Sequence, residues 1–138
     1  MNKKPQNALA CSALAALISF SQSTTAQQAA PTENRGVAGK LLGAVDLGPE
    51  IEGMAGRQLR LRVITIEAGG AATPHSHKDR PCVEYIVQGQ VIEHRNGVAK
   101  EYGPGDFVLA TNDTTHWWEN KGSHQAVLLP VDIAKTAN

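Results

Sequence analysis

The side chains best suited to chemistry lie close together in residues 75–84 and at one more distant position. His75 and His77 are one residue apart, Cys82 and Glu84 follow them, and His116 comes later in the chain. Residues i and i+2 of a strand point to the same face, so the first two histidines can present two imidazoles side by side. Imidazole, thiolate and carboxylate groups are the usual ligands of transition metals. The spacing therefore predicts a metal site, which His116 would complete from a distant strand.

Other residues near this group are candidates for binding a ligand or are expected to be solvated. Arg80 lies in the loop after the two histidines, where it could meet an anionic ligand or simply face water. Trp117 and Trp118 are adjacent, so on a strand they face opposite sides. We assign Arg80 and Trp117 to substrate binding as hypotheses. His94, beside a hairpin turn, and His124, in a Gly-Ser turn, are expected to be solvated.

The elements that must position these side chains are short strands. Gly69 and Gly70 are expected to end one of them, and Asn96-Gly97 is a strong hairpin signal. No amphipathic helix of useful length is expected after residue 26, and many short strands with Gly-rich turns predict an all-β sandwich or small barrel. The expected strands cover residues 41–47, 58–67, 83–93, 98–102, 107–110 and 125–132.

Residues 1–26 have the anatomy of a secretory signal peptide. Lys3 and Lys4 form a positive segment, an apolar run covers residues 8–20, and Ala26 is a small residue at the expected cleavage position. An uncleaved anchor helix is the alternative, but the run is short for a bilayer span. We therefore expect a secreted, periplasmic protein without membrane contact after cleavage. A flexible linker is expected at residues 27–40 and one barrel domain at residues 41–138.

The composition of the remaining chain excludes some partners. Cleavage would remove 26 of the 138 residues and leave 112, with 11 basic and 13 acidic residues and a net charge of about −2. Nucleic-acid binding calls for a strongly basic surface, so no nucleic-acid partner is expected. Cys82 would be the single remaining cysteine, which rules out an intrachain disulfide.

Counting outward from the two histidines gives a longer pattern that resembles a known family. Gly69, His75, His77, Cys82 and Gly89 follow the spacing G-x5-H-x-H-x4-C-x6-G. This pattern is similar to the first motif of the cupins, G-x5-H-x-H-x3–4-E-x6-G. The departure is that Cys82 stands where the motif has its glutamate.

Residues 105–120 resemble the second cupin motif, G-x5-P-x-G-x2-H-x3-N. Gly105, His116 and Asn120 fall in register, whereas Thr111 and Asp113 replace the proline and the glycine. The resemblance implies a single small conical β-barrel or jelly roll, often a homodimer, with a divalent transition metal inside (Fe, Mn, Ni or Zn). It also implies three histidine ligands: His75, His77 and His116.

The resemblance leaves the fourth ligand open, and two alternatives compete for it. Cys82 could face the metal as a thiolate, which would suit a softer or borderline metal such as zinc, copper or iron, or it could be a small buried hydrophobe. Glu84 lies two residues on and faces the same side, and its longer side chain could reach the metal or a bound water. A buried carboxylate needs a partner, which favours an inward Glu84.

These features lead to three functional hypotheses. The first is a metal-dependent enzyme, of oxygenase, isomerase or decarboxylase type, acting on a small organic molecule, with Glu84 as a general base whose pKa burial raises. The second is a non-catalytic periplasmic protein that holds a metal or a small ligand. The third is an assembly protein with a closed structural metal, for which a bound Cys82 would be the sign.

Overall fold

The computed structural model describes residues 28–136, and all regular structure within them is strand. No helix in this part of the chain is long and apolar enough to cross a membrane. The predicted all-β jelly-roll barrel is thereby confirmed, while the expected signal peptide lies outside the described residues. The strands are β1 Arg35–Asp46, β2 Arg57–Ser76, β3 Cys82–Gln88, β4 Val91–Arg95, β5 Val98–Tyr102, β6 Phe107–Ala110, β7 Thr115–Glu119 and β8 Ala126–Lys135.

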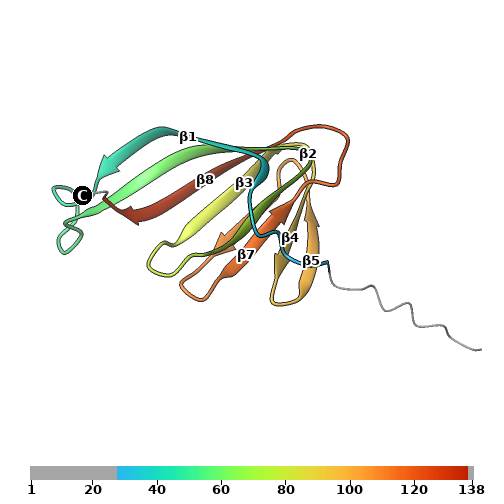
Figure 1. The fold of residues 1–138 in the computed structure, drawn as a ribbon. Helices are drawn as coiled ribbons and strands as arrows, with labels where there is room; N and C mark the ends of the chain where they lie inside the picture. The colour runs from blue at the N-terminus through green and yellow to red at the C-terminus, as the bar shows by residue number, and fades with distance from the viewer. Residues whose placement is uncertain (1–27, 137–138) are drawn as a thin grey trace, which may run out of the picture.

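The strands form one continuous sheet that folds over into two facing halves (Figure 1). Residues 57–66 of β2 pair with β1 and β8, which continues through β3 to β6; we call this part half I. Residues 71–76 of β2 pair with β7, which continues through β4 to β5; we call this part half II. β2 therefore belongs to both halves and connects the two walls of the barrel.

The two halves meet where β2 bends at Gly69 and Gly70. These glycines were expected to end a strand, but β2 continues past them to Ser76, so that expectation is wrong. Gly69 has a positive φ of 73°, and a side chain on Gly70 would lie 2.8 Å from two backbone oxygens. The glycines thus let one strand turn a corner and deliver His75 to the opposite wall.

Two further boundaries differ from expectation. Arg35–Lys40, placed in the flexible linker, belong to β1 instead. The expected strand 83–93 is divided into β3 and β4 at Gly89, where a Cβ atom would lie 2.7 Å from the carbonyl oxygen of Gln125. That close backbone approach requires glycine, and it starts β4 on its way into half II.

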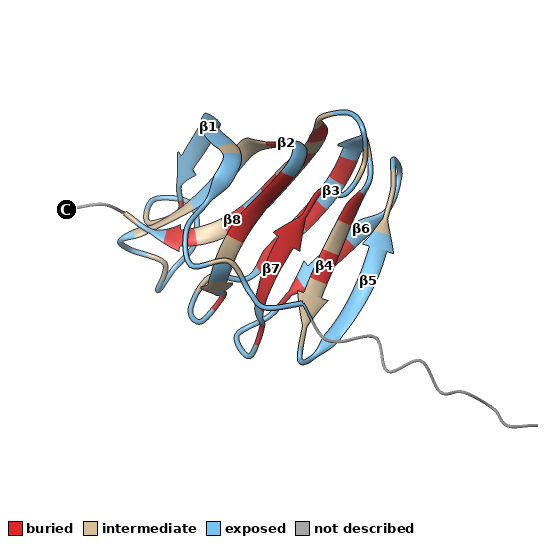
Figure 2. Ribbon diagram, turned by 45° about the vertical axis from the view of Figure 1, so that its right-hand side comes forward, coloured by how far each residue is buried: buried red, intermediate tan, exposed pale blue. Residues whose placement is uncertain are grey.

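The apolar core fills one end of the space between the halves. Figure 2 shows buried stretches on β2, β3, β4, β7 and β8, whereas β1 and β5 are largely exposed. Trp118 belongs to this core and also faces the cavity described below. The buried cluster consists of Ile66, Ala72, Ile86, Val91, Val108, Trp118, Ala126 and Leu128.

Asn120, the last residue of the second motif, holds the bend between the halves in place. Its side chain is fully buried and donates to the backbone oxygens of Ile66 and His124, each at 2.8 Å. Its side-chain oxygen accepts from the backbone of Gly122 at 2.9 Å. Its motif position therefore has a structural reason, because Asn120 supports the corner that positions the histidines.

Candidate metal centre

The three motif histidines converge between the halves. His75 and His116 are directly opposite each other on β2 and β7, and their Nε2 atoms are 3.1 Å apart. His77 follows the end of β2, and its Nε2 atom is 3.0 Å from that of His116. His77 and His116 are buried and His75 is partly exposed. Three imidazoles from two segments of the chain thus present the same ring atom to one point.

The other ring nitrogen of each histidine faces an oxygen acceptor. His75 Nδ1 lies 3.1 Å from the carbonyl oxygen of Thr73, and His77 Nδ1 lies 3.2 Å from that of Arg80. His116 Nδ1 lies 2.6 Å from a carboxylate oxygen of Glu93. We assign the ring proton to Nδ1 in all three, which leaves the three Nε2 lone pairs directed at one another.

Glu84 completes this group from β3. Its Oε1 atom is 3.5 Å from the Nε2 atoms of His77 and His116, and one ligand atom from each of the four residues lies within 4.8 Å of every other. Burial alone would raise the pKa of Glu84, but His116, His77 and His75 outweigh it and lower that pKa. The expected rise in the pKa of Glu84 is therefore wrong, because the neighbouring histidines stabilise its carboxylate form.

Burial and the surrounding charges shift the pKa values of the three histidines in different directions. Burial lowers the pKa of His75, and burial together with the charge of Arg80 lowers that of His77 to about 4. Burial acts the same way on His116, but its hydrogen bonds to Glu84 and Glu93 prevail and raise its pKa. Neutral imidazoles are the form that binds metals, so His75 and His77 are ready as ligands near neutral pH.

The donor set fits a divalent transition metal. Three imidazole lone pairs and one carboxylate meet with no proton donor assigned between them, an arrangement that a cation stabilises. Ligand atoms 2.0–2.2 Å from one ion lie roughly 2.8–3.6 Å apart for angles between 90° and tetrahedral. The four separations that involve His116 or join His77 to Glu84, 3.0, 3.1, 3.5 and 3.5 Å, fall in that range, and the other pairs lie within 4.8 Å. Nitrogen and carboxylate ligands suit manganese, iron, nickel and zinc.

Cys82 does not join the group, so its proposed role as a ligand is corrected. It lies on the same inward face of β3 as Glu84, one pleat earlier, and is not among the residues whose ligand atoms converge. Burial, with the nearby charges of Glu84 and Asp132, raises the pKa of its thiol to about 12. Cys82 is therefore a buried neutral thiol, and the inward position within reach of the histidines is that of Glu84.

Glu93 is a contributor that the sequence analysis missed. This buried carboxylate on β4 accepts from His116 Nδ1 at 2.6 Å and from Arg95 Nε at 2.8 Å. Arg95 also donates to the backbone oxygen of Leu109 on β6 at 3.2 Å, so it connects Glu93 to a strand of half I. Burial tends to raise the pKa of Glu93, but His116 and Arg95 lower it. A carboxylate behind a metal-binding histidine fixes its ring proton and orientation.

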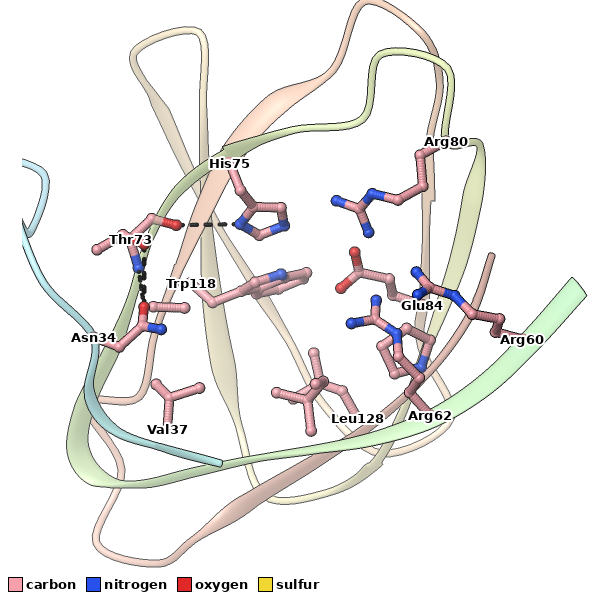
Figure 3. A pocket seen from close by; sticks show the side chains of 13 residues that line it. Asn34, Val37, Arg60, Arg62, Thr73, His75, Arg80, Glu84, Trp118 and Leu128 are labelled. Carbon is pink, nitrogen blue, oxygen red and sulfur yellow. Dashed lines mark hydrogen bonds between the residues drawn. The ribbon is translucent and has the colours of Figure 1, made fainter. Parts of the chain in front are cut away.

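A cavity of about 380 Å³ adjoins the group. Figure 3 shows the lining residues: His75 and Trp118 lie near the centre of the view, Arg80, Glu84, Arg60 and Arg62 on one side, and Asn34, Thr73 and Val37 on the other. The lining residues include His75 and Glu84, two members of the converging group. A small molecule in this cavity would therefore lie against the candidate metal centre.

The structure also locates the remaining candidates. Arg80 lines the cavity, but the indole that does so is that of Trp118, not Trp117. Trp117 is buried and stacks on His94 with ring centroids 3.6 Å apart. His94 is partly buried and lies 3.1 Å from Glu119, so its expected solvation is wrong. His124 is exposed, as expected.

The comparisons with known proteins agree with the fold. The family model for the cupin domain matches residues 62–132, so the chain belongs to the cupin family. No curated protein matches the sequence significantly. The predicted family membership is confirmed.

Solved structures similar to this chain share its fold at low sequence identity. KdgF from Halomonas sp. is 21% identical with a TM-score of 0.56, over 70% of this chain and 80% of its own. A cupin-2 domain from Rhodospirillum rubrum is 18% identical with a TM-score of 0.58, over 80% and 70%. An RmlC-like cupin from Shewanella frigidimarina is 19% identical with a TM-score of 0.55, over 71% and 76%.

Proposed function

We propose that this cupin is a metal-dependent enzyme acting on a small organic molecule. The observation that carries the proposal is that the cavity is lined by His75 and Glu84, two members of the converging group. A purely structural metal would be enclosed by protein ligands, whereas a catalytic site keeps an approach for substrate. The reaction classes that suit such a centre are oxygenation, isomerisation and decarboxylation.

The residues of the chain have separate roles in this proposal. His75, His77, His116 and Glu84 hold the metal, and Glu93 holds the ring of His116 in orientation. When bound, the metal would supply Lewis-acid polarisation of a substrate oxygen or activation of a small co-substrate. The indole of Trp118 and the side chain of Leu128 give the cavity an apolar wall that limits water beside the substrate.

The alternative is a non-catalytic protein that binds a small ligand at the same centre. Arg60, Arg62 and Arg80 line the cavity, and guanidinium groups bind anions but do not transfer protons near neutral pH. Turnover with a bound ligand separates the alternatives, because a binding protein would release that ligand unchanged. We also propose, from the signal-like segment at residues 1–26, that the protein acts in the periplasm or outside the cell.

The test of the metal centre uses two variants from the same inward face of β3. Loss of an outer partner of a ligand costs roughly 10–100-fold in metal affinity. Loss of a direct ligand should cost at least the upper end of that range. We therefore expect Glu84→Gln to weaken binding of Mn²⁺ or Zn²⁺ by at least about 100-fold, measured by calorimetry. Cys82→Ser serves as the matched control and should leave the affinity unchanged. The proposal fails if the purified wild-type protein binds no first-row metal, or if both variants behave alike.

The partner that we propose is a second copy of this chain, packed on the outer face of half I. Directly opposed residues form apolar rows across the strands: Leu61, Val131, Val83 and Leu109 make one such row. Tyr85 and Phe107 are opposed in a neighbouring row. Nine large apolar side chains of this face are 38–59% exposed: Val45, Leu59, Leu61, Val83, Tyr85, Val87, Phe107, Leu109 and Val131.

The size of this outer face argues for a partner. Its nine exposed side chains come from neighbouring strands, and exposed apolar patches of this kind mark interaction sites. Each partner contributes about 800 Å² to an interface of standard size. Two copies meeting through this one face would cover the same residues on both, as a two-fold dimer does.

A further inference from the structure

The cavity has a cationic wall built from three arginines around one buried carboxylate. Arg60 donates twice to Asp132, with both distances 2.9 Å. Arg62 and Arg80 donate to the same carboxylate at 3.2 Å and 3.1 Å. The Asp132 side chain is fully buried, and the three arginine side chains are 23–26% exposed. The arginines are thus held in place, with their charged groups at the cavity wall.

The charges of this wall do not balance. Three guanidinium groups face the one carboxylate of Asp132. The carboxylate of Glu84 also lines the cavity, beside His77 and His116, and with both carboxylates counted the wall keeps an excess of one positive charge. Partly buried charges without a counter-charge are costly, and an anion in the cavity would offset that cost.

Two buried donors point to the same kind of ligand. Arg62 Nε and the indole Nε1 of Trp118 have no hydrogen-bond partner among residues 28–136. Both residues line the cavity, and Trp118 is 3% exposed. A buried donor without an acceptor costs free energy, so a small side-chain shift that brings either donor to a ligand's acceptor would be favourable.

The other residues that line the cavity indicate what the rest of the ligand should be. Val37, Ile64 and Leu128 offer apolar contact, and Figure 3 places Val37 across the cavity from the arginines. A volume of about 380 Å³ admits a small molecule rather than a peptide or polymer chain. The cavity is therefore charged at one end, apolar along the wall, and bordered by His75.

We propose that the ligand is a small organic carboxylate, with its carboxylate group on Arg60, Arg62 and Arg80 and its carbon body against Leu128 and Val37. This inference rests on the proposed function, because the same cavity would present the ligand to the metal centre. The planar fork of arginine matches a carboxylate, and it also matches a phosphate. The apolar wall favours an organic acid over inorganic phosphate, and the experiment compares the two.

The test measures binding of succinate and benzoate by calorimetry, each against its neutral amide, succinamide or benzamide, and with inorganic phosphate as a third arm. We expect at least one carboxylate to bind more tightly than its amide by about tenfold or more, since a hydrogen bond to a charged group is lost in the amide. Arg62→Gln should weaken carboxylate binding by about tenfold or more. Arg57→Gln, on the same strand outside the cavity lining, is the matched control and should leave binding unchanged.

Zn²⁺ affinity is measured on the same variants and should not change, which separates this proposal from the metal centre. If Zn²⁺ fails to bind but Arg62-dependent carboxylate binding persists, the proposed enzyme is wrong and the carboxylate site stands. The inference is overturned if every amide binds as tightly as its acid, if phosphate outcompetes both carboxylates, or if Arg62→Gln binds like wild type. Arg62→Lys keeps the charge and loses the fork, so a weakened Arg62→Lys supports the site should Arg62→Gln fail to fold.

Discussion

The two faces of half I differ in chemical character, and beside the cavity the usual arrangement of an antiparallel sheet is reversed. Such sheets commonly place apolar residues on the core side and polar residues on the solvent side. Here the inward face carries Arg60, Arg62, Glu84 and Asp132 beside the cavity, while the outward face carries rows of leucine, valine and aromatic side chains. The cavity end of half I therefore has a charged inner face and an apolar outer face, while the rest of its inner face carries core residues such as Ile66, Ile86 and Val108.

This difference separates two functions of one sheet. The inward charges persist because they are arranged in pairs and clusters, with Asp132 among the arginines and Glu84 among the histidines. Contact with water does not stabilise the outward apolar rows, and exposed apolar surface of this kind is typical of interfaces between chains. In our proposals the inward face binds a small ligand and the outward face binds a second copy of the chain.

The largest expected effect comes from removing the negative charge at the centre of the inward face. Burial alone would raise the pKa of Asp132, but hydrogen bonds from Arg60 and Arg80 and the charge of Arg62 lower it, so the carboxylate is ionised. Asp132→Asn leaves three guanidinium groups without their counter-charge. Because breaking a buried ion pair from one side costs roughly 3–5 kcal/mol, we expect the free energy of unfolding to fall by about 3 kcal/mol. Urea unfolding measures this change.

The control for that prediction is a carboxylate at the surface. Asp79 lies 3.9 Å from Lys135, and both side chains are more than half exposed. Exposed pairs contribute little, so Asp79→Asn should change the free energy of unfolding by less than about 1 kcal/mol. Equal losses in the two variants would mean that the buried cluster is no more important than a surface pair.

The next effect concerns the outward face. Leu109 is 56% exposed and lies in a row with Val83 on β3. Leu109→Asp would place charges inside the proposed interface, and a central interface residue is worth about 2 kcal/mol or more. We therefore expect the dissociation constant of the dimer to rise about 30-fold or more, measured by light scattering over a dilution series.

Val98 provides the matched substitution on the other half of the sheet. It is 65% exposed on β5, outside the apolar rows, so Val98→Asp should leave the association unchanged. A monomeric wild-type protein would contradict the dimer.

The fold was predictable because its signals are local. Alternating apolar residues, Gly-rich turns and the motif spacing together gave the all-β barrel and the family. The exception is instructive: in Gln58–Val63 the alternation predicts a half-buried strand, for which leucines would ordinarily face inward. Arg60 and Arg62 face the cavity instead, and Leu59 and Leu61 are exposed. Periodicity shows that two faces differ, but a dimer face and a core face have the same apolar composition.

The candidate site was predictable in part. The three histidines follow from their spacing, but Cys82 and Glu84 share one face of β3, so periodicity cannot choose between them. Which of the two side chains reaches the histidines depends on how far the histidine group lies from β3, and that distance is set by the tertiary structure. Glu93 could have been suspected, because it stands two residues after the buried Val91 and should share its inward face. Its partner His116 comes from another strand, and no local pattern connects the two.

The smallest expected effect tests whether Glu93 positions the metal centre from behind. Glu93→Gln keeps the shape of the side chain but removes the charge that faces His116 Nδ1 and Arg95. We expect metal affinity to fall by about 10–100-fold, because such partners fix the orientation and basicity of a ligating histidine. Glu101→Gln, on the exposed strand β5, is the control and should bind metal like wild type. If Glu93→Gln also retains full affinity, the backbone of β7 alone positions His116, and the charged interior of the barrel ends at the four converging residues.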